Sequence, residues 1–333
     1  MKRTTPQETK LLICVWHKFT LWRPPAHFAA SIHRRWPTMH VTQLPNYNHV
    51  ADELPDTDIL VGFSFRPEQF ALAKKLKWIH ATAAGVGQLM FPELRQSSIV
   101  LTNARGIHSV PMSEHILGML LAMTRRFPDA FRFQQAAHWA QQEIWDACPG
   151  ELNGKLLLIV GFGSIGHALA RLLQPMGMRI WGMTRSGQGD AQLVERILPA
   201  TELHAALPQA DFVILAAPET PDTRQMIGAR ELALMKPSAY LFNFARGTLV
   251  DQDALIAALH ARTIAGAALD VTAEEPLPPE SPLWKLDNVF ITPHISAATQ
   301  NLWQRQEDLL LENLERWFDG RELLNRVDLQ RGY

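Results

Sequence analysis

Three segments that follow apolar, strand-like runs contain residues able to bind a carboxylate, polarise a carbonyl or move a proton. They are residues 242–247, which include Arg246, the acidic stretch 269–278, and residues 291–294, which end in His294. Open α/β sheets bind their ligands at the carboxyl ends of the strands. An arginine at such a place can bind two oxygens at once through its planar guanidinium. The alternative for Arg246 is a surface arginine that caps a helix.

His294 follows a predicted strand and the rigid residue Pro293, which would hold it at the edge of the sheet. A carboxylate beside it would orient the ring and favour its protonated form. Such a pair can give a proton to a carbonyl oxygen while a nicotinamide delivers hydride to the carbon. The chain has 13 histidines, most of which must have ordinary roles, and His294 alone could be one of them.

A glycine-rich loop at residues 161–166 follows the apolar run 156–160 and has the spacing G-x-G-x-x-G. In a dinucleotide site the first glycine permits a tight turn, the second lets backbone approach the pyrophosphate, and the third allows close helix–strand packing. The following helix would offer unpaired N–H groups to the phosphates. Glycines also occur in ordinary turns, but the strand before and the helix after favour a dinucleotide site. The predicted contacts in this loop are Gly161, Gly163, Ser164, Ile165 and Gly166.

The choice of cofactor is predicted from the end of the next strand, at Thr184, Arg185 and Ser186. Sites that prefer NAD place an acidic residue there to bind the ribose 2′-hydroxyl. No carboxylate occupies this place, and Arg185 could pair with a 2′-phosphate, helped by the two hydroxyls. A surface arginine is the alternative. We therefore expect NADP(H) to be preferred and NAD(H) to be possible.

The composition is that of a globular protein with a sizeable core: 333 residues, 47% hydrophobic, 20% charged, with a formal net charge of −1. Nothing in the charge balance suggests a nucleic acid or an anionic membrane as partner. The two cysteines, Cys14 and Cys148, are far apart, which fits a reducing compartment and argues against a thiolate metal site. No apolar run suggests a signal peptide or a membrane span. We expect a cytoplasmic protein without a structural metal.

Elements that would position these residues alternate regularly between strand and helix. Six strands are predicted from residue 155 onward, at 156–160, 179–183, 212–216, 239–244, 265–270 and 289–292. Such alternation is typical of a Rossmann-type, doubly wound parallel sheet. Before it, strands at 11–16, 58–62 and 78–81 predict a smaller α/β domain. A last helix, 299–319, ended by Gly320, is expected to pack back on that first domain.

The cofactor domain (104–297) would then be an insertion in a substrate domain made of residues 1–103 and 298–333, with a hinge and cleft at Asn103 and Ala298. In the substrate domain, the loop Gly85-Val86-Gly87 could bind a ligand or be a plain turn. A helix from Pro111, capped by Ser109 or Ser113, has an apolar stripe over 112–123, which suits a core or a subunit interface. A second helical segment is predicted over 127–145.

Six motifs together resemble the D-isomer-specific 2-hydroxyacid dehydrogenase family over nearly the whole chain. They lie at residues 161–166, 216–224, 243–251, 266–271, 275–284 and 292–294. Within the family, residues 278–284 and the ending Arg331-Gly332-Tyr333 are most similar to the glyoxylate/hydroxypyruvate reductase A branch. The resemblance implies a flavodoxin-like substrate domain, and a homodimer whose arm (112–147) clasps the other subunit.

The resemblance also assigns roles to residues. It places the substrate-binding arginine at Arg246, its acidic partner at Glu275 and the acid/base histidine at His294. Cofactor contacts implied in addition to those above are Ala217, Pro218, Thr223, Phe244, Ala245, Arg246, Asp270, His294 and Ala297. Substrate contacts implied are Gly85, Val86, Gly87, Arg246, His294 and, reaching the pocket of the partner, Trp139.

One departure from the family pattern is Gly87, which stands where an aspartate is usual, although backbone N–H groups there could still bind a carboxylate. The resemblance implies an NADPH-preferring reductase of small 2-keto acids, with a D-2-hydroxy acid as product. One alternative is a dinucleotide-sensing binding protein related to transcriptional corepressors, which would not need Arg246, Glu275 and His294 together. Others are a dehydrogenase for another 2-hydroxy acid, and oxidation of formate or phosphite. Glu275 speaks against the formate branch, which pairs its histidine with glutamine.

Overall fold

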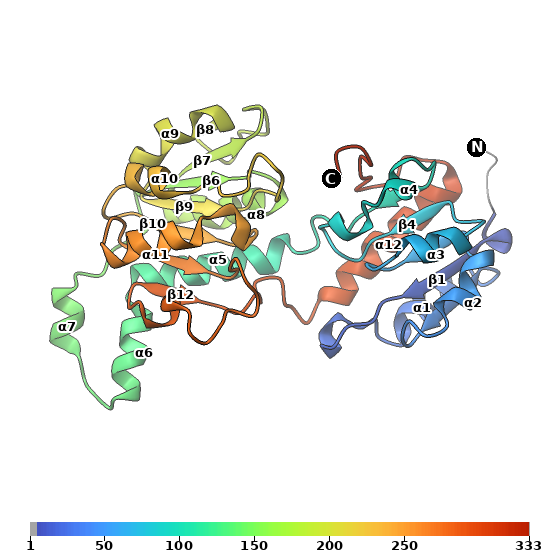
Figure 1. Cartoon of the computed structure of the whole chain (residues 1–333), viewed down its shortest axis with the longest axis horizontal. Coiled ribbons are helices and arrows are strands. Elements are labelled where there is room, and N and C mark those ends of the chain that lie inside the picture. Colours follow the sequence, from blue (N-terminus) through green and yellow to red (C-terminus); the bar gives the residue numbers. More distant parts are fainter. Residues whose placement is uncertain (1–4, 333) are drawn as a thin grey trace. The chain divides into compact units, whose positions relative to one another are not determined.

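The chain forms two compact units in the computed structural model, which describes residues 5–332 (Figure 1). Unit 1 consists of Met1–Ile107 and Ala298–Tyr333, and unit 2 of His108–Ala297. Unit 2 is therefore an insertion in the sequence of unit 1. Of the ending 331–333, Tyr333 lies outside the described residues. Among the residues described, no helix is long and apolar enough to cross a membrane.

Unit 1 contains a parallel sheet of five strands in the order β2-β1-β3-β4-β5. The strands are β1 (Lys10–Cys14), β2 (His40–Leu44), β3 (Ile59–Val61), β4 (Trp78–His80) and β5 (Val100–Thr102). Alternate residues of β1 enter different cores: Leu12 and Cys14 pack on one face, Leu11 and Ile13 on the other. This strand order is that of flavodoxin-like folds, as the family resemblance implied.

Two strands of unit 1, β2 and β5, were absent from the sequence-based prediction. β2 is half-exposed and contains His40, Thr42 and Gln43, so it lacks the apolar run of a buried parallel strand. β5 is a strand of three residues, like β3 and β4. The helices of this unit are α1 (His27–Arg35), α2 (Val50–Glu53), α3 (Pro67–Leu72), α4 (Pro92–Arg95) and α12 (Leu302–Asp319).

Helix α12 belongs to unit 1 by its contacts. Leu310 and Leu314 are fully buried in the core that also contains Leu11 and Ile13. The ring of Trp303 meets Phe28 edge to face, and Trp317 stacks on Trp78 with ring centroids 5.5 Å apart. Gly320 ends the helix in the left-handed conformation, with φ of 69°, as predicted.

Unit 2 contains a parallel sheet of seven strands in the order β12-β11-β10-β9-β6-β7-β8. This is the Rossmann order, which confirms the predicted fold class. The strands are β6 (Leu156–Val160), β7 (Arg179–Thr184), β8 (Arg196–Pro199), β9 (Phe212–Leu215), β10 (Tyr240–Asn243), β11 (Gly266–Leu269) and β12 (Val289–Ile291). The prediction of six strands omitted β8, an edge strand that begins with arginine and ends with proline.

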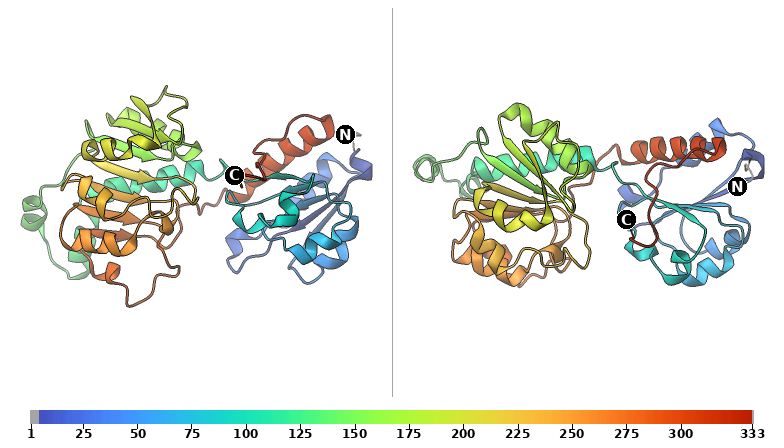
Figure 2. Two further views of the ribbon diagram at one scale, coloured as in Figure 1. Left: turned by 45° about the horizontal axis from the view of Figure 1, so that its top comes forward. Right: turned by 90° about the horizontal axis from the view of Figure 1, so that it is seen from above.

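Helices cover both faces of this sheet (Figure 2). Leu157 and Ile159 of β6 enter one core with α5 (Ser109–Thr124) and α8 (Ser164–Leu173). Leu156 and Leu158 enter the other core. The helices of that second face are α9 (Leu203–Ala206), α10 (Ala229–Leu234) and α11 (Gln252–His260).

The predicted serine cap of the helix from Pro111 and the predicted start of the arm are wrong. Helix α5 has no side-chain cap: His108 is the N-cap residue, and the Ser113 hydroxyl donates to the carbonyl of Val110 inside the helix. The methionine stripe faces the core of unit 2, where Met112, Met119 and Met123 are buried, which is the core alternative that its pattern allowed. The implied arm, 112–147, therefore does not include residues 112–123.

The region 127–145 is not one helix. It breaks into α6 (Phe127–Gln135) and α7 (Gln141–Asp146), because Ala137 takes a left-handed conformation with φ of 50°. Both helices project from the body of unit 2 (Figure 1).

Candidate active site

The three glycines of the 161–166 loop have different surroundings. A Cβ on Gly161 would lie 2.3 Å from the backbone nitrogen of Ala217, and its φ is +96°, so the fold itself requires glycine there. A Cβ on Gly166 would lie 2.8 Å from the Phe162 ring. At Gly163, no atom lies within 4 Å of the place that a Cβ would take. Packing therefore explains the first and third glycines. The second faces open space, where a ligand could approach the protein backbone.

Helix α8 begins directly after Gly163, so its first N–H groups, from Ser164 onward, point toward that space. A helix of ten residues in this position offers both unpaired donors and the positive end of its dipole to a phosphate. The open space at Gly163 and this helix start fit the pyrophosphate of a dinucleotide. Contact of a dinucleotide with Gly161, Gly163, Ser164, Ile165 and Gly166 stays a prediction.

The predicted cofactor-selecting residues lie at the neighbouring strand end. The carbonyl of Met183 in β7 accepts from the N–H groups of Gly161 and Phe162, at 3.0 and 2.8 Å. This ties the glycine loop to the turn that carries Arg185. The Thr184 hydroxyl donates to the carbonyl of Gln188, and Ser186 accepts from the N–H of Gln188. Both hydroxyls thus also shape the turn that presents the exposed Arg185.

A third loop, after β9, completes this edge of the sheet. Ala217 lies against Gly161, as the close approach above shows. The Thr223 hydroxyl donates to the carbonyl of Pro218 at 2.7 Å and accepts from the N–H of Thr220 at 2.8 Å. Because β9, β6 and β7 are adjacent and parallel, the three predicted cofactor loops meet at one sheet edge.

Arg246 lies at the end of the adjacent strand β10, on a turn that a buried asparagine holds. Asn243 accepts from the N–H of Ala245 at 3.1 Å and donates to the carbonyl of Arg246 at 2.9 Å. The Arg246 side chain is exposed. A Cβ on Gly247 would lie 1.9 Å from the carbonyl carbon of Thr272, so the Arg246 turn and the loop that carries Glu275 are in direct contact.

His294 and Glu275, which the family resemblance implies as a pair, are in contact. The Nδ1 atom of His294 lies 2.7 Å from a carboxylate oxygen of Glu275. Their side chains are 50% and 38% exposed, so the ring remains accessible while its carboxylate partner orients it. The N–H of Thr272 donates to the other Glu275 oxygen at 3.2 Å and fixes the carboxylate in turn. With Glu275 at Nδ1, the Nε2 atom is the nitrogen that can serve a substrate.

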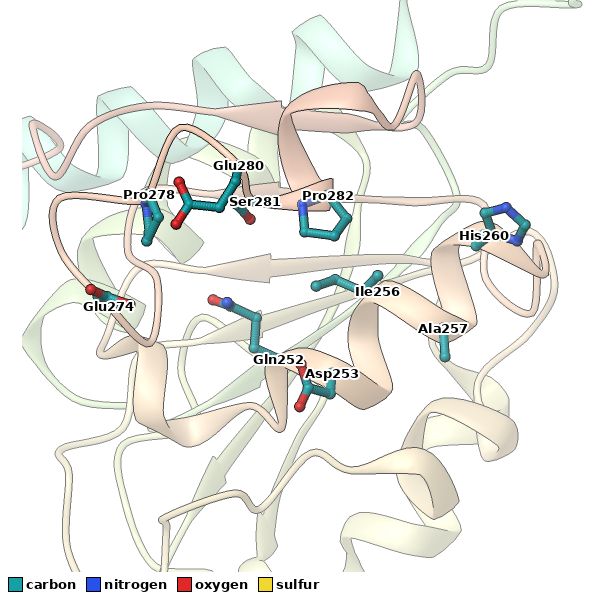
Figure 3. Close-up of a pocket in the computed structure, with 10 residues that line it drawn as sticks. All are labelled: Gln252, Asp253, Ile256, Ala257, His260, Glu274, Pro278, Glu280, Ser281 and Pro282. Carbon is teal, nitrogen blue, oxygen red and sulfur yellow. The ribbon is translucent and has the colours of Figure 1, made fainter.

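A pocket of about 610 Å³ lies behind this loop, between α11 and residues 274–282 (Figure 3). Gln252 projects from the start of α11 toward the loop, and its side-chain oxygen accepts from the N–H of Ala273 at 3.1 Å. Arg246, Glu275 and His294 are not among the residues that line the pocket. The Gln252 bond to Ala273 instead makes this pocket wall a support for the loop that carries Glu275.

Asp270, predicted as a cofactor contact, has a fully buried carboxylate. That carboxylate accepts from the Thr292 hydroxyl at 2.6 Å and from the N–H groups of Ile295 and Ser296 at 2.9 and 3.0 Å. Its backbone carbonyl accepts from the N–H of His294 at 2.8 Å. In the structure Asp270 thus holds the loop on which His294 and Ala297 lie.

The remaining predicted residues lie elsewhere. Gly85, Val86 and Gly87 belong to unit 1, where the Asn103 side chain donates to the carbonyl of Ala84 at 2.8 Å, and Val86 is buried. Trp139 lies between α6 and α7 and is 88% exposed. In unit 2, Phe244 and Ala245 are buried directly after β10, and the Phe244 ring enters the core.

Two residues that support the site were not predicted. Asn243 and Thr292 both stand at strand ends, so the rule that located Arg246 and His294 could have found them.

Comparison with known proteins identifies the family. A family model described as D-isomer specific 2-hydroxyacid dehydrogenase, NAD binding domain, matches residues 117–296. A glyoxylate reductase of Pyrococcus furiosus is 38% identical over 272 residues, which cover 79% of this chain and 80% of the relative.

Solved structures give the same result. A D-isomer specific 2-hydroxyacid dehydrogenase family protein from Aeromonas salmonicida is 30% identical, with a TM-score of 0.83 over 97% of this chain and 99% of the other. An NADPH-dependent glyoxylate/hydroxypyruvate reductase from Sinorhizobium meliloti, solved with NADP and sulfate, is 25% identical, with a TM-score of 0.81 over 98% and 100%.

The chain therefore belongs to the D-isomer specific 2-hydroxyacid dehydrogenase family, as its motifs predicted. It is an oxidoreductase, a 2-hydroxyacid reductase that uses a nicotinamide cofactor.

Proposed function

We propose that this protein is an NADPH-preferring reductase of small 2-keto acids, of the glyoxylate and hydroxypyruvate type, and that its products are D-2-hydroxy acids. The observation that carries the proposal is the His294–Glu275 pair, 2.7 Å apart and accessible, at the carboxyl edge of a Rossmann sheet. The relatives named as glyoxylate reductases support the choice of substrates.

The nicotinamide supplies hydride to the keto carbon when it is bound. His294 holds a proton at Nε2 for the carbonyl oxygen, which would otherwise become an alkoxide as hydride arrives. Glu275 keeps the ring in position through Nδ1 and stabilises the ring while it is protonated. Arg246, exposed on the neighbouring loop, binds the substrate carboxylate or carbonyl through its planar fork.

Unit 1 is proposed as the substrate domain. Backbone N–H groups of Val86 and Gly87 would bind the substrate carboxylate. Cys14 and Cys148 are both free, which suits the reducing cytoplasm that we propose as the location.

A preference for NADPH is supported by the turn at residues 184–188. It presents Arg185 next to the glycine loop and supplies the hydroxyls of Thr184 and Ser186, with no carboxylate among residues 182–186 to repel a 2′-phosphate.

We propose a homodimer because several aromatic residues of unit 2 are exposed. Phe131, Trp139 and Trp145 on or between α6 and α7 are 64%, 88% and 73% exposed. A groove of about 590 Å³ beside α6 is lined by apolar side chains that include Phe127, Phe131 and Trp284. Exposed aromatic residues on this scale are typical of an interface.

The direct test is a steady-state assay of the purified protein with glyoxylate, hydroxypyruvate and larger 2-keto acids, each with NADPH and with NADH. We expect turnover of the small acids with NADPH, and D-glycerate as the product of hydroxypyruvate by chiral chromatography. Binding of NADPH without turnover of any 2-keto acid would contradict the proposal and favour a dinucleotide sensor.

Replacement of Arg185 tests the cofactor preference. We expect Arg185→Ala to raise KM for NADPH at least about tenfold, because a charge-assisted contact of about 1.5 kcal/mol or more is lost. KM for NADH should change little, and Arg230→Ala, which removes an exposed arginine of α10, should change neither. Equal effects of Arg185→Ala on both cofactors would rule out the 2′-phosphate contact.

A further inference from the structure

His115, in the middle of α5, is connected to the catalytic loop by a chain of hydrogen bonds. Its Nε2 atom lies 3.1 Å from the hydroxyl of Thr292 and 3.9 Å from Oδ1 of Asp270. The Thr292 hydroxyl lies 2.6 Å from the same Asp270 oxygen. Neither the strand-end rule nor the glycine motif points to His115, because it lies on a helix far from both in sequence.

The donors and acceptors in this series of hydrogen bonds follow from the hydrogens that the side chains carry. Thr292 has one hydroxyl hydrogen, and the short distance to a buried carboxylate assigns that hydrogen to Asp270. The Thr292 oxygen must therefore accept from His115. Burial lowers the pKa of His115, opposed by the charge of Asp270, so the ring is neutral at pH 7 and its single N–H lies on Nε2. His115 therefore donates to Thr292, and Thr292 donates to Asp270.

The last members of this hydrogen-bond series are backbone groups of the loop that carries His294. Two N–H groups of the loop, from Ile295 and Ser296, donate to the Asp270 carboxylate. His294 itself has a φ of +54°, a left-handed conformation that is uncommon for a residue with a Cβ. Such a conformation persists only where surrounding contacts determine it. The Asp270 carboxylate supplies those contacts, and Thr292 and His115 fix the position of the carboxylate.

We propose that His115 is a positioning residue for His294: through Thr292 it holds the Asp270 carboxylate, and through that carboxylate the backbone from which the catalytic ring projects. The proposal rests on the function proposed above for His294. His115 contacts neither the His294–Glu275 pair nor the loop of residues 161–166 through any of these bonds, so its effect should fall on turnover.

The test compares two replacements of His115 that differ in their hydrogen-bonding ability. Phenylalanine keeps an aromatic ring against Phe244, whose centroid is 5.9 Å from that of His115, but has no donor. Glutamine carries an amide N–H group at about the place of Nε2. We expect His115→Phe to lower kcat about tenfold, since small displacements of a catalytic group cost one to two powers of ten. His115→Gln should stay within about threefold of the wild type.

Two further readings separate positioning from general damage. KM for glyoxylate and Kd for NADPH, from fluorescence titration, should stay within about twofold in both variants. Thr292→Val should lower kcat as much as His115→Phe, Thr292→Ser should preserve it, and the double variant His115→Phe/Thr292→Val should lose no more than either alone. His260→Phe, at the exposed end of α11, is the matched control and should behave as the wild type.

Wild-type kcat in His115→Phe, equal losses in His115→Phe and His115→Gln, or losses that multiply in the double variant would each overturn the proposal. If His115→Phe fails to fold, as judged by thermal unfolding, the Thr292→Val and Thr292→Ser pair gives the same decision. His294→Asn is measured in parallel. Wild-type turnover in His294→Asn would refute the proposed function itself, whereas its inactivity with a normal His115→Phe would refute the positioning role alone.

Discussion

Unit 1 and unit 2 each have a histidine at the carboxyl end of a parallel strand, and the two residues have opposite surroundings. His80 is the last residue of β4, is 1% exposed, and its Nδ1 atom lies 2.9 Å from the Thr102 hydroxyl, which also accepts from the Trp78 indole. His294 follows β12, is half-exposed, and has the carboxylate of Glu275 at its Nδ1.

The difference separates a residue that serves the fold from one that can serve chemistry. Burial lowers the pKa of His80 to about 4, so its ring stays neutral and contributes a hydrogen bond and packing. His294 has solvent on one side and a carboxylate on the other, so its ring is both accessible and held in one orientation. The same residue type near the carboxyl end of a parallel strand is therefore suited to different functions, according to the groups that surround it.

The largest expected effect on stability comes from His80. Its folded-state pKa of about 4 lies below the unfolded value of 6.5, so its contribution is complete above pH 6.5 and is lost as the pH falls toward 4. We expect a loss of about 3 kcal/mol in the unfolding free energy of unit 1 over this range. Denaturant unfolding of the wild type at pH 7 and pH 4 measures it.

His80→Asn keeps a side chain that can hydrogen-bond to Thr102 but removes the imidazole that titrates. The part of the pH dependence that His80 causes should therefore disappear. His33→Asn, which changes an exposed histidine of the same unit, should leave it in place. An unchanged pH dependence in His80→Asn would mean that burial of His80 is not what opposes its protonation.

Next in size is the effect of the carboxylate that distinguishes His294 from His80. Glu275→Gln keeps the shape and the hydrogen bond but removes the charge that stabilises a protonated ring. We expect kcat for glyoxylate to fall about 100-fold, equivalent to about 2.7 kcal/mol, with little change in unfolding free energy. Glu274→Gln, at the adjacent exposed carboxylate, is the control. Equal kcat values for wild type and Glu275→Gln would remove the reason for treating the two histidines differently.

The smallest expected effect applies the same distinction to the glycines of the dinucleotide loop. Gly163 has open space where a Cβ would lie, so Gly163→Ala should leave the melting temperature unchanged and raise Kd for NADPH about tenfold. Gly161→Ala, which would clash with Ala217, should destabilise unit 2 instead. A lower melting temperature in Gly163→Ala with unchanged NADPH binding would show that this glycine serves the fold.

Most of the fold was predictable because buried parallel strands are short apolar runs, and those of unit 2 from β6 to β12 have that form with β8 as the exception. The residues at their ends followed from topology and motif. Asp270 shows what the sequence could not predict. Like His294, it follows a strand, but only three-dimensional packing shows that its carboxylate is buried and faces the loop. His115 was beyond sequence reasoning because its partner, Thr292, is 177 residues away.

The central claim is that His294 supplies the proton to the substrate carbonyl. The most direct test is kcat for glyoxylate with NADPH in His294→Asn, measured beside His260→Asn. We predict a fall of about 10²–10⁴ in His294→Asn alone, with NADPH binding and melting temperature unchanged in both variants. A kcat near the wild-type value in a folded His294→Asn protein would contradict the account.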